Sequence, residues 1–300
     1  MSHPDRKILI TGSGGFIGST CIRTLAERGD YSLICPPSSQ LDVSSIESVE
    51  ATMSKYRPDT VINFAAHRNA NTAELQKNIK NGSAWMTNVV GAENLVETCQ
   101  IYGSYLLQIS SDMVFSGKRD KKGPYAESDL PEDDPNNLSW YGWTKRVAEK
   151  SVASYGNSCI VRIGNVTKPI YDWTLDFIGK ILWSFDTGNS YPLFNDQWIT
   201  LTCVSELVQS LMVLVDSSQN GIQHVSCDNI VTPYELTEYL LSKSRNNKYK
   251  INTASVDDYL NNHPNRYPKW GGLKSKSTQA RLGEYMPWQA VVDYFIKFAT

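Results

Sequence analysis

The chain has 300 residues, of which 41% are hydrophobic and 20% are charged, and its formal net charge is −2. This length and apolar fraction can form one large α/β domain with a smaller C-terminal lobe. The near-neutral charge gives no reason to expect nucleic acid or an anionic membrane surface as a partner. No apolar run approaches the length that a membrane span needs.

The cysteines and histidines indicate a reducing compartment and no metal site. None of the six cysteines forms a CxxC pair, and no pairing pattern is visible, which is typical of reduced core thiols. The N-terminus lacks the apolar segment of a signal peptide. The four histidines are scattered along the chain. We therefore expect a cytoplasmic protein that holds no metal ion.

The first predicted strand, Lys7–Thr11, runs directly into a glycine-rich turn and then into a helical pattern. Glycines at GxxGxxG spacing allow a tight turn and close approach of a pyrophosphate, and the helix N-terminus adds free N–H groups. A loop without a ligand is the alternative. The residues expected to bind a dinucleotide here are Gly12, Gly15, Phe16, Ile17 and Gly18.

The second strand, within Tyr31–Cys35, decides which nicotinamide cofactor is favoured. An acidic residue at the end of this strand binds the ribose 2′-hydroxyl and favours NAD. Here the strand continues into Pro36–Ser39 without an acid. The room left for a 2′-phosphate favours NADPH over NADH.

Strands and helices alternate through about residue 165. Further strands are expected at Thr60–Phe64, from Leu106 and at Ser158–Ile163, with a long helix over 81–102. This alternation predicts an α/β fold with a Rossmann-like, doubly wound parallel sheet. The pattern loosens afterwards, so we predict a dinucleotide-binding domain over 1–167 and a substrate-binding lobe over 168–300.

Small polar residues end the strand that begins at Leu106. Ser110, Ser111 and Asp112 follow its apolar run, at the sheet edge where open α/β sheets bind ligands. The Ser111 hydroxyl could therefore hydrogen-bond a substrate oxygen. Serines that only terminate the strand are the alternative.

Tyr141 and Lys145 are four residues apart and so share one face of a helix. An ammonium beside a phenol favours the phenolate, so Lys145 is predicted to lower the pKa of Tyr141 from about 10 toward neutrality. Tyr141 would then exchange protons at cellular pH. This spacing alone also occurs by chance in many helices.

The segment Lys118–Asn137 is polar, charged and rich in proline and glycine, which predicts a loop near the active site. It contains three consecutive acids, Glu132, Asp133 and Asp134. Because charge clusters are usually exposed, we interpret them as a solvated surface rather than a metal site.

Taken together, the glycine turn, Ser111, Tyr141 and Lys145 resemble the extended short-chain dehydrogenase/reductase family. More specifically, the chain resembles the sugar-nucleotide reductases typified by dTDP-4-dehydrorhamnose reductase, and this resemblance covers nearly the whole chain. Three segments carry it: PDTVINFAAH from Pro58, SSDMVFSG from Ser110 and RYPKWGGL from Arg266. Asn165 departs from the reductases, which carry tryptophan there, and is nearer to the sugar-nucleotide epimerases.

The resemblance implies further site residues. Asp42 and Val43 look like the pair beneath the adenine ring, although Asp42 could instead cap the helix predicted from Ser44 to Tyr56. Arg68 resembles an arginine of NADP-binding relatives, with a plain surface arginine as the alternative. The resemblance also places Phe64, Ala65, Ala66 and His67 at the cofactor, Ser111, Asp112, Asn165 and Arg266 at the substrate, and Tyr141 and Lys145 at both the cofactor and the reaction.

The activity implied is NAD(P)H-dependent reduction of a nucleotide-linked 4-keto-6-deoxy sugar, with the proton from Tyr141. Met113 stands where dehydratases carry glutamate and fucose-type epimerase-reductases carry cysteine, so neither of those reactions is expected. A sugar-nucleotide C4 epimerase remains open. So does an NADP-binding regulatory subunit, like the beta subunit of methionine adenosyltransferase. The sequence does not decide whether the chain forms a homodimer.

Overall fold

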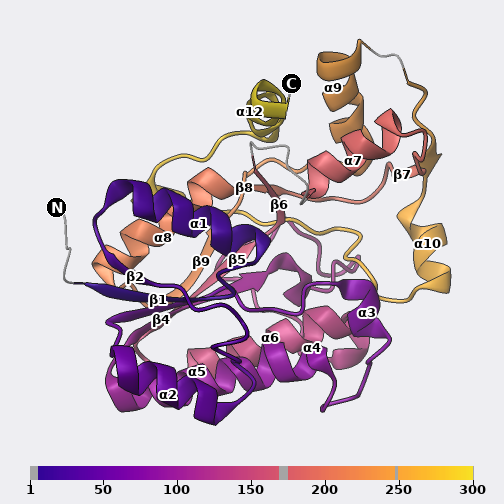
Figure 1. The fold of residues 1–300 in the computed structure, drawn as a ribbon. Helices are drawn as coiled ribbons and strands as arrows, with labels where there is room; N and C mark the ends of the chain where they lie inside the picture. Colours follow the sequence, from indigo (N-terminus) through magenta and orange to yellow (C-terminus); the bar gives the residue numbers. More distant parts are fainter. Residues whose placement is uncertain (1–5, 169–174, 247–248, 300) are drawn as a thin grey trace. The chain divides into compact units, whose positions relative to one another are not determined.

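A computed structural model of the chain describes residues 6–168, 175–246 and 249–299 (Figure 1). The chain divides into two compact units. The first comprises the chain through Val114, together with Glu132–Arg162 and Val208–Gln223, and the second comprises Phe115–Pro131, Ile163–Leu207 and the chain from His224. The division predicted after residue 167 stays a prediction.

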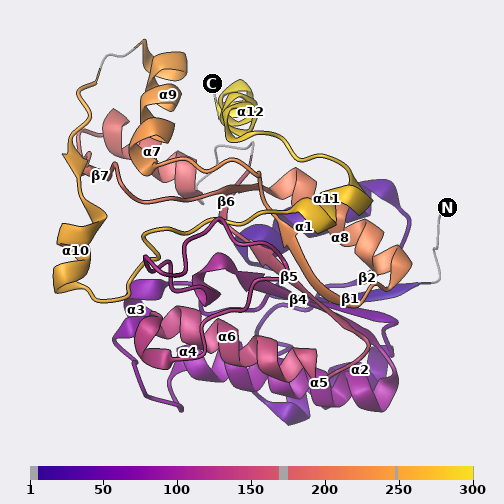
Figure 2. The ribbon, with the colours of Figure 1, turned by 180° about the vertical axis from the view of Figure 1, so that it is seen from behind.

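The central element is a parallel six-stranded sheet in the order β2-β1-β3-β4-β5-β9. Its strands are β1 (Lys7–Thr11), β2 (Ser32–Ile34), β3 (Thr60–Asn63), β4 (Tyr105–Ser111), β5 (Ser158–Ile163) and β9 (Gly221–Val225). Helices α1 (Phe16–Arg28) and α8 (Val204–Ser217) cover one face, and α2 (Ile46–Tyr56), α5 (Gly91–Tyr102) and α6 (Trp140–Ala153) cover the other (Figures 1 and 2). The predicted fold class is confirmed.

The strand order creates a switch point between β1 and β3. From β1 the chain goes to β2 on one side and later returns to β3 on the other. Connections leave the carboxyl ends of such neighbouring strands in opposite directions, which opens the crevice where doubly wound folds bind ligands. The glycine turn after β1 and the segment after β3 both lie at this switch point.

A ladder of buried polar side chains crosses the three strands at this edge of the sheet. The Thr11 hydroxyl donates to Asn63 Oδ1 at 2.5 Å, and Asn63 Nδ2 donates to Gln108 Oε1 at 2.8 Å. The backbone N–H of Ala65 also donates to Asn63 Oδ1, at 3.1 Å. These bonds satisfy polar groups that would be costly to bury alone, and they fix how β1, β3 and β4 end relative to one another.

The helix predicted over 81–102 is present, but it is not α-helical throughout. It consists of α4 (Ser83–Trp85), a π-helical segment (Met86–Val90) and α5. π-helical turns insert one extra residue and occur often at functional sites. A short helix, α3 (Ala70–Glu74), precedes it.

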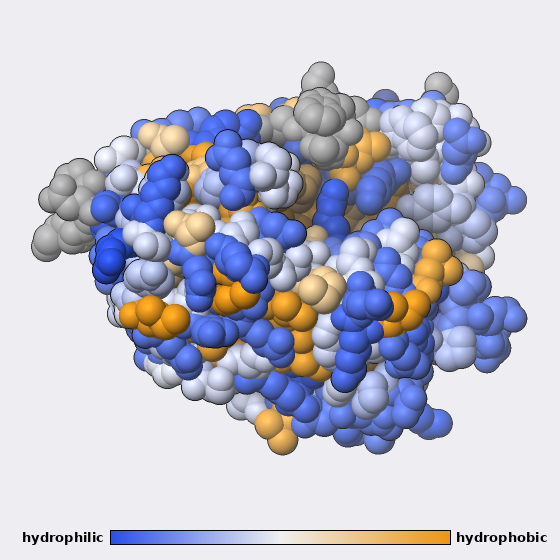
Figure 3. All heavy atoms as spheres, turned by 60° about the horizontal axis from the view of Figure 1, so that its bottom comes forward, coloured by the Kyte–Doolittle hydropathy of each residue, from blue (hydrophilic) through white to orange (hydrophobic). Residues whose placement is uncertain are grey.

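One hydrophobic cluster of the first unit lies between the sheet and the helices on the α2, α5 and α6 face. It is built from aliphatic side chains of the strands and helices, among them Leu9, Val49, Met53, Val61, Leu95, Leu106, Val152 and Ile160. Helix α2 shows the pattern: it buries Val49, Thr52 and Met53 and turns its charged residues outward. Figure 3 shows one face of the molecule, where hydrophilic side chains predominate and hydrophobic ones form small separate groups.

The second unit has small sheets and several helices around its own core. Its strands are β6 (Asn165–Thr167), β7 (Leu193–Phe194), β8 (Leu201–Cys203) and β10 (Thr253–Ala254), and its helices include α7 (Phe177–Asp186), α9 (Pro233–Arg245), α10 (Val256–Asn262), α11 (Lys276–Leu282) and α12 (Trp288–Ala299). A capping box of Thr232 and Glu235 begins α9. Among the described residues, no helix has both the length and the apolarity to cross a bilayer.

We expect Gly12→Ala to destabilise the first unit by at least about 2 kcal/mol, because an alanine at this position is strained in two ways. Gly12 has a φ of 63°, and a Cβ there would lie 2.7 Å from the backbone nitrogen of Ala65. Urea unfolding measures the loss. Gly14→Ala is the matched control, because a Cβ at Gly14 meets nothing within 4 Å. Equal stability of the two variants would contradict the assignment.

Candidate active site

The turn after β1 can receive an anionic group. Gly15 caps α1 without a side-chain hydrogen bond, and the first turn of α1 carries no acidic residue. The Gly15 N–H donates to the Gly12 carbonyl at 2.9 Å, which holds the turn closed. The remaining N–H groups and the positive end of the helix dipole suit a phosphate. Phe16, Ile17 and Gly18 form the first turn of α1, and their role toward a cofactor stays a prediction.

The segment after β3 is held to the body of the unit by Asn88. The backbone N–H of His67 donates to Asn88 Oδ1 at 2.8 Å, and Asn88 Nδ2 donates to the His67 carbonyl at 3.2 Å and to Thr144 Oγ1 at 2.9 Å. The residues just before these hydrogen bonds are half-buried; they are Phe64, Ala65 and Ala66.

Asn88 therefore ties the segment after β3 to helix α6, between Tyr141 and Lys145. The sequence analysis missed it. The signal was a polar residue on the apolar face of the helix over 81–102. Asn88 lies within the π-helical segment of that helix.

The side chains of His67 and Arg68 differ in their surroundings. The His67 ring hydrogen-bonds with Thr72 Oγ1 at 2.9 Å and with Ser83 Oγ at 3.2 Å, so it is occupied within the protein. Arg68 is exposed, and its positive charge acts on the phenol of Tyr141. Whether Arg68 also contacts a cofactor phosphate stays a prediction.

Asp42 does not cap α2, so that interpretation of the residue is wrong. The N-cap is Ser45, whose side chain accepts from the Ser48 N–H. Asp42 Oδ1 instead accepts from the N–H and hydroxyl of Ser44, at 2.9 and 2.7 Å. Val43 is buried, and its carbonyl accepts from Asn94 Nδ2 at 2.9 Å. A role of Asp42 and Val43 at an adenine ring stays a prediction.

Helix α6 begins with the Ser139 side chain accepting from the Gly142 N–H, and it places Tyr141 in its first turn and Lys145 one turn later. Tyr141 is half-buried and Lys145 is buried. Lys145 Nζ donates to the Ile109 carbonyl at 2.7 Å, near the end of β4. Two residues farther along β4, the Ser111 side chain interacts with Tyr141. The structure thus brings together the three residues predicted to be catalytic.

The prediction that the pKa of Tyr141 is lowered toward neutrality is wrong for this structure. Burial raises the pKa of Tyr141 to about 12, and the Asp112 carboxylate raises it further, while Ser111 and Arg68 act in the opposite direction. Burial also lowers the pKa of Lys145 to about 8, against the effect of Glu149. The four-residue spacing correctly predicts a shared helix face, but it carries no information about burial, which dominates here.

Asp112 is the third perturbed group in this cluster. Its carboxyl is buried, and burial raises its pKa to about 6, although hydrogen bonds from Ser111 and from backbone N–H groups lower it. The Ser111 hydroxyl donates to Asp112 Oδ1 at 3.1 Å and accepts from the Met113 N–H at 3.2 Å. Perturbed groups of this kind concentrate at functional sites.

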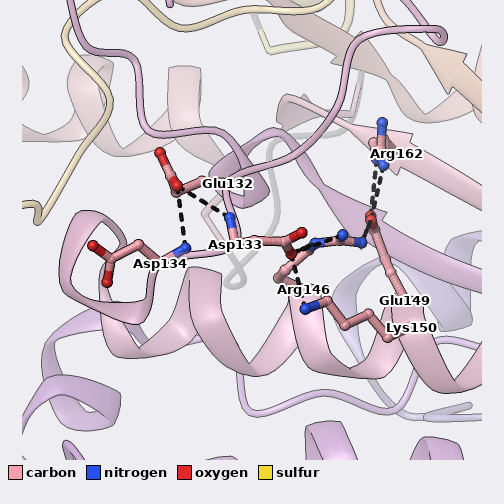
Figure 4. Close-up of polar contacts among 7 residues, drawn as sticks. All are labelled: Glu132, Asp133, Asp134, Arg146, Glu149, Lys150 and Arg162. Carbon is pink, nitrogen blue, oxygen red and sulfur yellow. Dashed lines mark hydrogen bonds and ion pairs between the residues drawn. The ribbon is translucent and has the colours of Figure 1, made fainter.

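One turn beyond Lys145, helix α6 contributes to a buried ion pair that the sequence analysis also missed. Arg162 on β5 donates from Nε and Nη2 to the two carboxylate oxygens of Glu149 on α6, at 2.9 and 2.8 Å (Figure 4). The two side chains are 0% and 1% exposed. An acid one turn beyond Lys145 and an arginine inside a predicted strand were the available signals.

The sequence predicted that the three acids of the loop before α6 form a solvated surface. This is wrong for one of them. Glu132 is buried, and its Oε1 accepts from the N–H groups of Asp133 and Asp134, both at 3.1 Å (Figure 4). Asp133 pairs with Arg146 and Lys150 of α6, both at 2.9 Å. Glu132 is buried because its carboxylate accepts hydrogen bonds from the backbone of the loop, whereas Asp133 pairs with the helix. Among the residues that the structure describes, no group of three potential ligands could hold a metal ion.

Asn165 and Arg266, predicted to bind substrate, both belong to the second unit. Asn165 begins β6, and its N–H donates to the Thr200 carbonyl at 3.1 Å. Arg266 is half-buried after α10, and its N–H donates to the His263 carbonyl at 3.2 Å. Their roles toward a substrate stay predictions.

Comparisons with known proteins agree with one another. The family model described as RmlD substrate binding domain matches residues 6–300. The probable low-salt glycan biosynthesis reductase of Haloferax volcanii is 26% identical over 292 residues, covering 93% of each chain. Methionine adenosyltransferase 2 subunit beta of Xenopus tropicalis is 28% identical, over 78% of this chain and 71% of that protein. The crystal structure of dTDP-4-dehydrorhamnose reductase from Bacillus anthracis, in complex with NADP, matches with a TM-score of 0.84 and 23% identity over 99% of both chains, which shows a common fold.

We expect Asp112→Asn to be more stable than the wild-type protein at neutral pH, by up to about 3 kcal/mol. The folded-state pKa of Asp112 is raised from 3.8 to about 6, so the folded state favours the protonated carboxyl and loses stability as pH rises through that range. Asparagine keeps the acceptor for Ser111 and stays neutral.

Urea unfolding at acidic and neutral pH tests this, with the exposed Asp120→Asn as control. The stability difference should vanish once the wild-type carboxyl is protonated in both the folded and unfolded states. An advantage of Asp112→Asn that is equal at both pH values would refute the explanation.

Proposed function

The chain belongs to the RmlD substrate binding domain family, within the extended short-chain dehydrogenases/reductases, and we propose that it reduces the keto group of a nucleotide-linked 4-keto-6-deoxy sugar with NADPH. The observation that carries the proposal is the cluster of Ser111, Tyr141 and Lys145 at the carboxyl end of β4. It lies one strand from the switch point where the fold can bind a dinucleotide.

The turn after β1 fits the pyrophosphate of the cofactor. Gly12 and Gly15 keep the backbone bare, and the first turn of α1 offers N–H groups without a competing acid. The strand β2 ends without an acid, which suits a 2′-phosphate and therefore NADPH. When bound, NADPH supplies the hydride.

The residues of the first unit then have distinct tasks. Tyr141 would donate a proton to the oxygen of the ketone, whose carbon would receive the hydride. Ser111 orients that oxygen by turning its hydroxyl proton from Asp112 to the ketone, while its own oxygen keeps accepting from the Met113 N–H. Lys145 supplies a positive charge one helical turn from Tyr141, where negative charge develops after the proton leaves.

The electrostatics of Tyr141 support reduction over epimerisation. A pKa raised to about 12 keeps the phenol protonated at neutral pH, which is the form that a reductase uses first. A C4 epimerase must first remove a proton from its substrate, for which the phenolate is needed. The buried Asp112 carboxylate beside the phenol makes that form more costly.

Residues of the second unit could bind the sugar and its nucleotide. Asn165 and Arg266 are our candidates in the second unit. Arg266 carries a positive charge that acts on Tyr267, and a guanidinium suits a diphosphate.

A second candidate function is a cofactor-binding regulatory subunit. The similarity to a protein named methionine adenosyltransferase 2 subunit beta favours it. An intact Ser-Tyr-Lys cluster does not exclude it, because fold and site can persist where turnover is not needed.

Cofactor stoichiometry tests the proposed function. We expect the purified protein to consume one NADPH per reduced product when given a panel of nucleotide 4-keto-6-deoxy sugars, with the product identified by mass spectrometry. An epimerase would show product without net change in NADPH absorbance. Tight NADP binding without turnover of any sugar, together with a co-purifying protein partner, would favour the regulatory subunit.

Tyr141→Phe tests the proton donor. General acid catalysis contributes about 10²–10⁴-fold, so kcat should fall by that factor while NADPH affinity, measured by calorimetry, changes little. The matched control is Tyr56→Phe at the end of α2, which also removes one phenol oxygen and should leave kcat unchanged. A Tyr141→Phe protein with wild-type turnover would refute the mechanism.

A further inference from the structure

Three residues of α6, each four positions apart, lie against three consecutive residues of β4. The side chain of Ser111 interacts with Tyr141, and Lys145 Nζ donates to the Ile109 carbonyl at 2.7 Å. The third contact joins the hydroxyl of Ser110 to Glu149 Oε1, at 2.6 Å. Residues at this spacing share one helix face, so Glu149 continues the row begun by Tyr141 and Lys145.

The carboxylate of Glu149 is held in place by groups from three elements. Ser110 on β4 and Arg162 on β5 both donate to it directly. Arg146 on α6 has its Nη1 3.9 Å from Glu149 Oε2 and also pairs with Asp133 (Figure 4). Arg162 is completely buried and Glu149 is 1% exposed, so these bonds cannot be exchanged for water.

A purely stabilising role is a weak explanation for such a pair. Removing two charges from water costs several kcal/mol, and replacing a buried ion pair by well-packed apolar residues is often neutral or stabilising. A buried pair beside a reactive group has a second effect. The nearer of its two charges acts on that group, because the protein interior screens charges poorly.

The charge of Glu149 acts on Lys145. Burial lowers the pKa of Lys145 to about 8, and the Glu149 carboxylate opposes that effect. Arg162 holds both carboxylate oxygens of Glu149 with hydrogen bonds. Asp112 faces the same cluster from the turn after β4 and acts on Tyr141.

We propose that Glu149 is a positioning residue for the reaction: held by Arg162, it fixes the end of β4 against α6 and keeps a negative charge one turn beyond Lys145. The inference rests on the proposed function, because it concerns the ammonium that supports proton donation by Tyr141. In Glu149→Gln alone, the buried guanidinium of Arg162 would lose the carboxylate that it pairs with, so the test removes both charges together.

The first arm of the test reads the charge of Lys145 without cofactor or substrate. Protein labelled with ¹³C at the lysine ε-carbon is titrated by NMR, and the Lys145 signal is assigned by its loss in Lys145→Met. The Lys145 midpoint should fall by about one unit in the double variant Glu149→Gln/Arg162→Met. Glu149→Gln/Arg162→Gln removes the same charges if the methionine packs badly.

Asp133→Asn is the matched control. It disturbs Arg146 and Lys150 but leaves Glu149 and Arg162 paired, so it should leave the Lys145 midpoint unchanged.

The second arm measures kcat/KM for the nucleotide sugar against pH. Activity that needs the Lys145 ammonium falls as pH rises through the pKa of Lys145, so the alkaline limb should move to lower pH in the double variant and stay in place in Asp133→Asn. An unshifted NMR midpoint, or a shifted midpoint with an unshifted limb, would overturn the role of Glu149. Failure of the wild-type protein to oxidise NADPH with any nucleotide sugar would instead overturn the proposed function, and the NMR arm distinguishes the two failures.

Discussion

The close packing of α6 on the end of β4 is the constraint on which the candidate site depends. Gly142 makes it feasible, because a Cβ at that position would overlap the carbonyl oxygen of Met113 in the turn after β4. The residues on either side of this contact are Tyr141 on the helix and Ser111 and Asp112 before the turn. Any side chain at Gly142 would push the helix away and separate the phenol from the serine, even though neither of them had been changed.

The same packing determines the charges. Burial shifts three groups toward their neutral forms: it raises the pKa of Asp112 and Tyr141 and lowers the pKa of Lys145. A dry site of this kind costs stability, but it strengthens each remaining electrostatic interaction. Within the buried pair of Glu149 and Arg162, the Glu149 carboxylate then acts on Lys145. The more exposed pairs of Asp133 with Arg146 and Lys150 tie the preceding loop to the same helix.

Local patterns were sufficient to predict the parallel sheet with its helices and the helix face that Tyr141 and Lys145 share. The run from Lys7 to Gly18 has a strand, a glycine turn and a helix in sequence, and its geometry is set by neighbours along the chain. The four-residue spacing of Tyr141 and Lys145 correctly predicted a shared helix face for the same reason. The pKa of Tyr141 could not be predicted, because it depends on burial by residues far away in sequence. Glu132 was misjudged because an acid run shows charge but not which carboxylate a loop turns inward.

Residues that connect distant segments were missed for a related reason. Asn88 joins His67, which is 21 positions away, to Thr144, which is 56 positions away. Such a long-range hydrogen bond produces no periodic pattern in the sequence. Its only sign is a polar residue at a position where an apolar one is expected. The buried ladder from Thr11 through Asn63 to Gln108 is of the same kind. Because each of these polar groups would be costly to leave unpaired, the strands can end in only one mutual register. That register places the glycine turn, the segment after β3 and Ser111 along one edge of the sheet. The buried polar residues Thr11, Asn63 and Gln108 therefore align the candidate site.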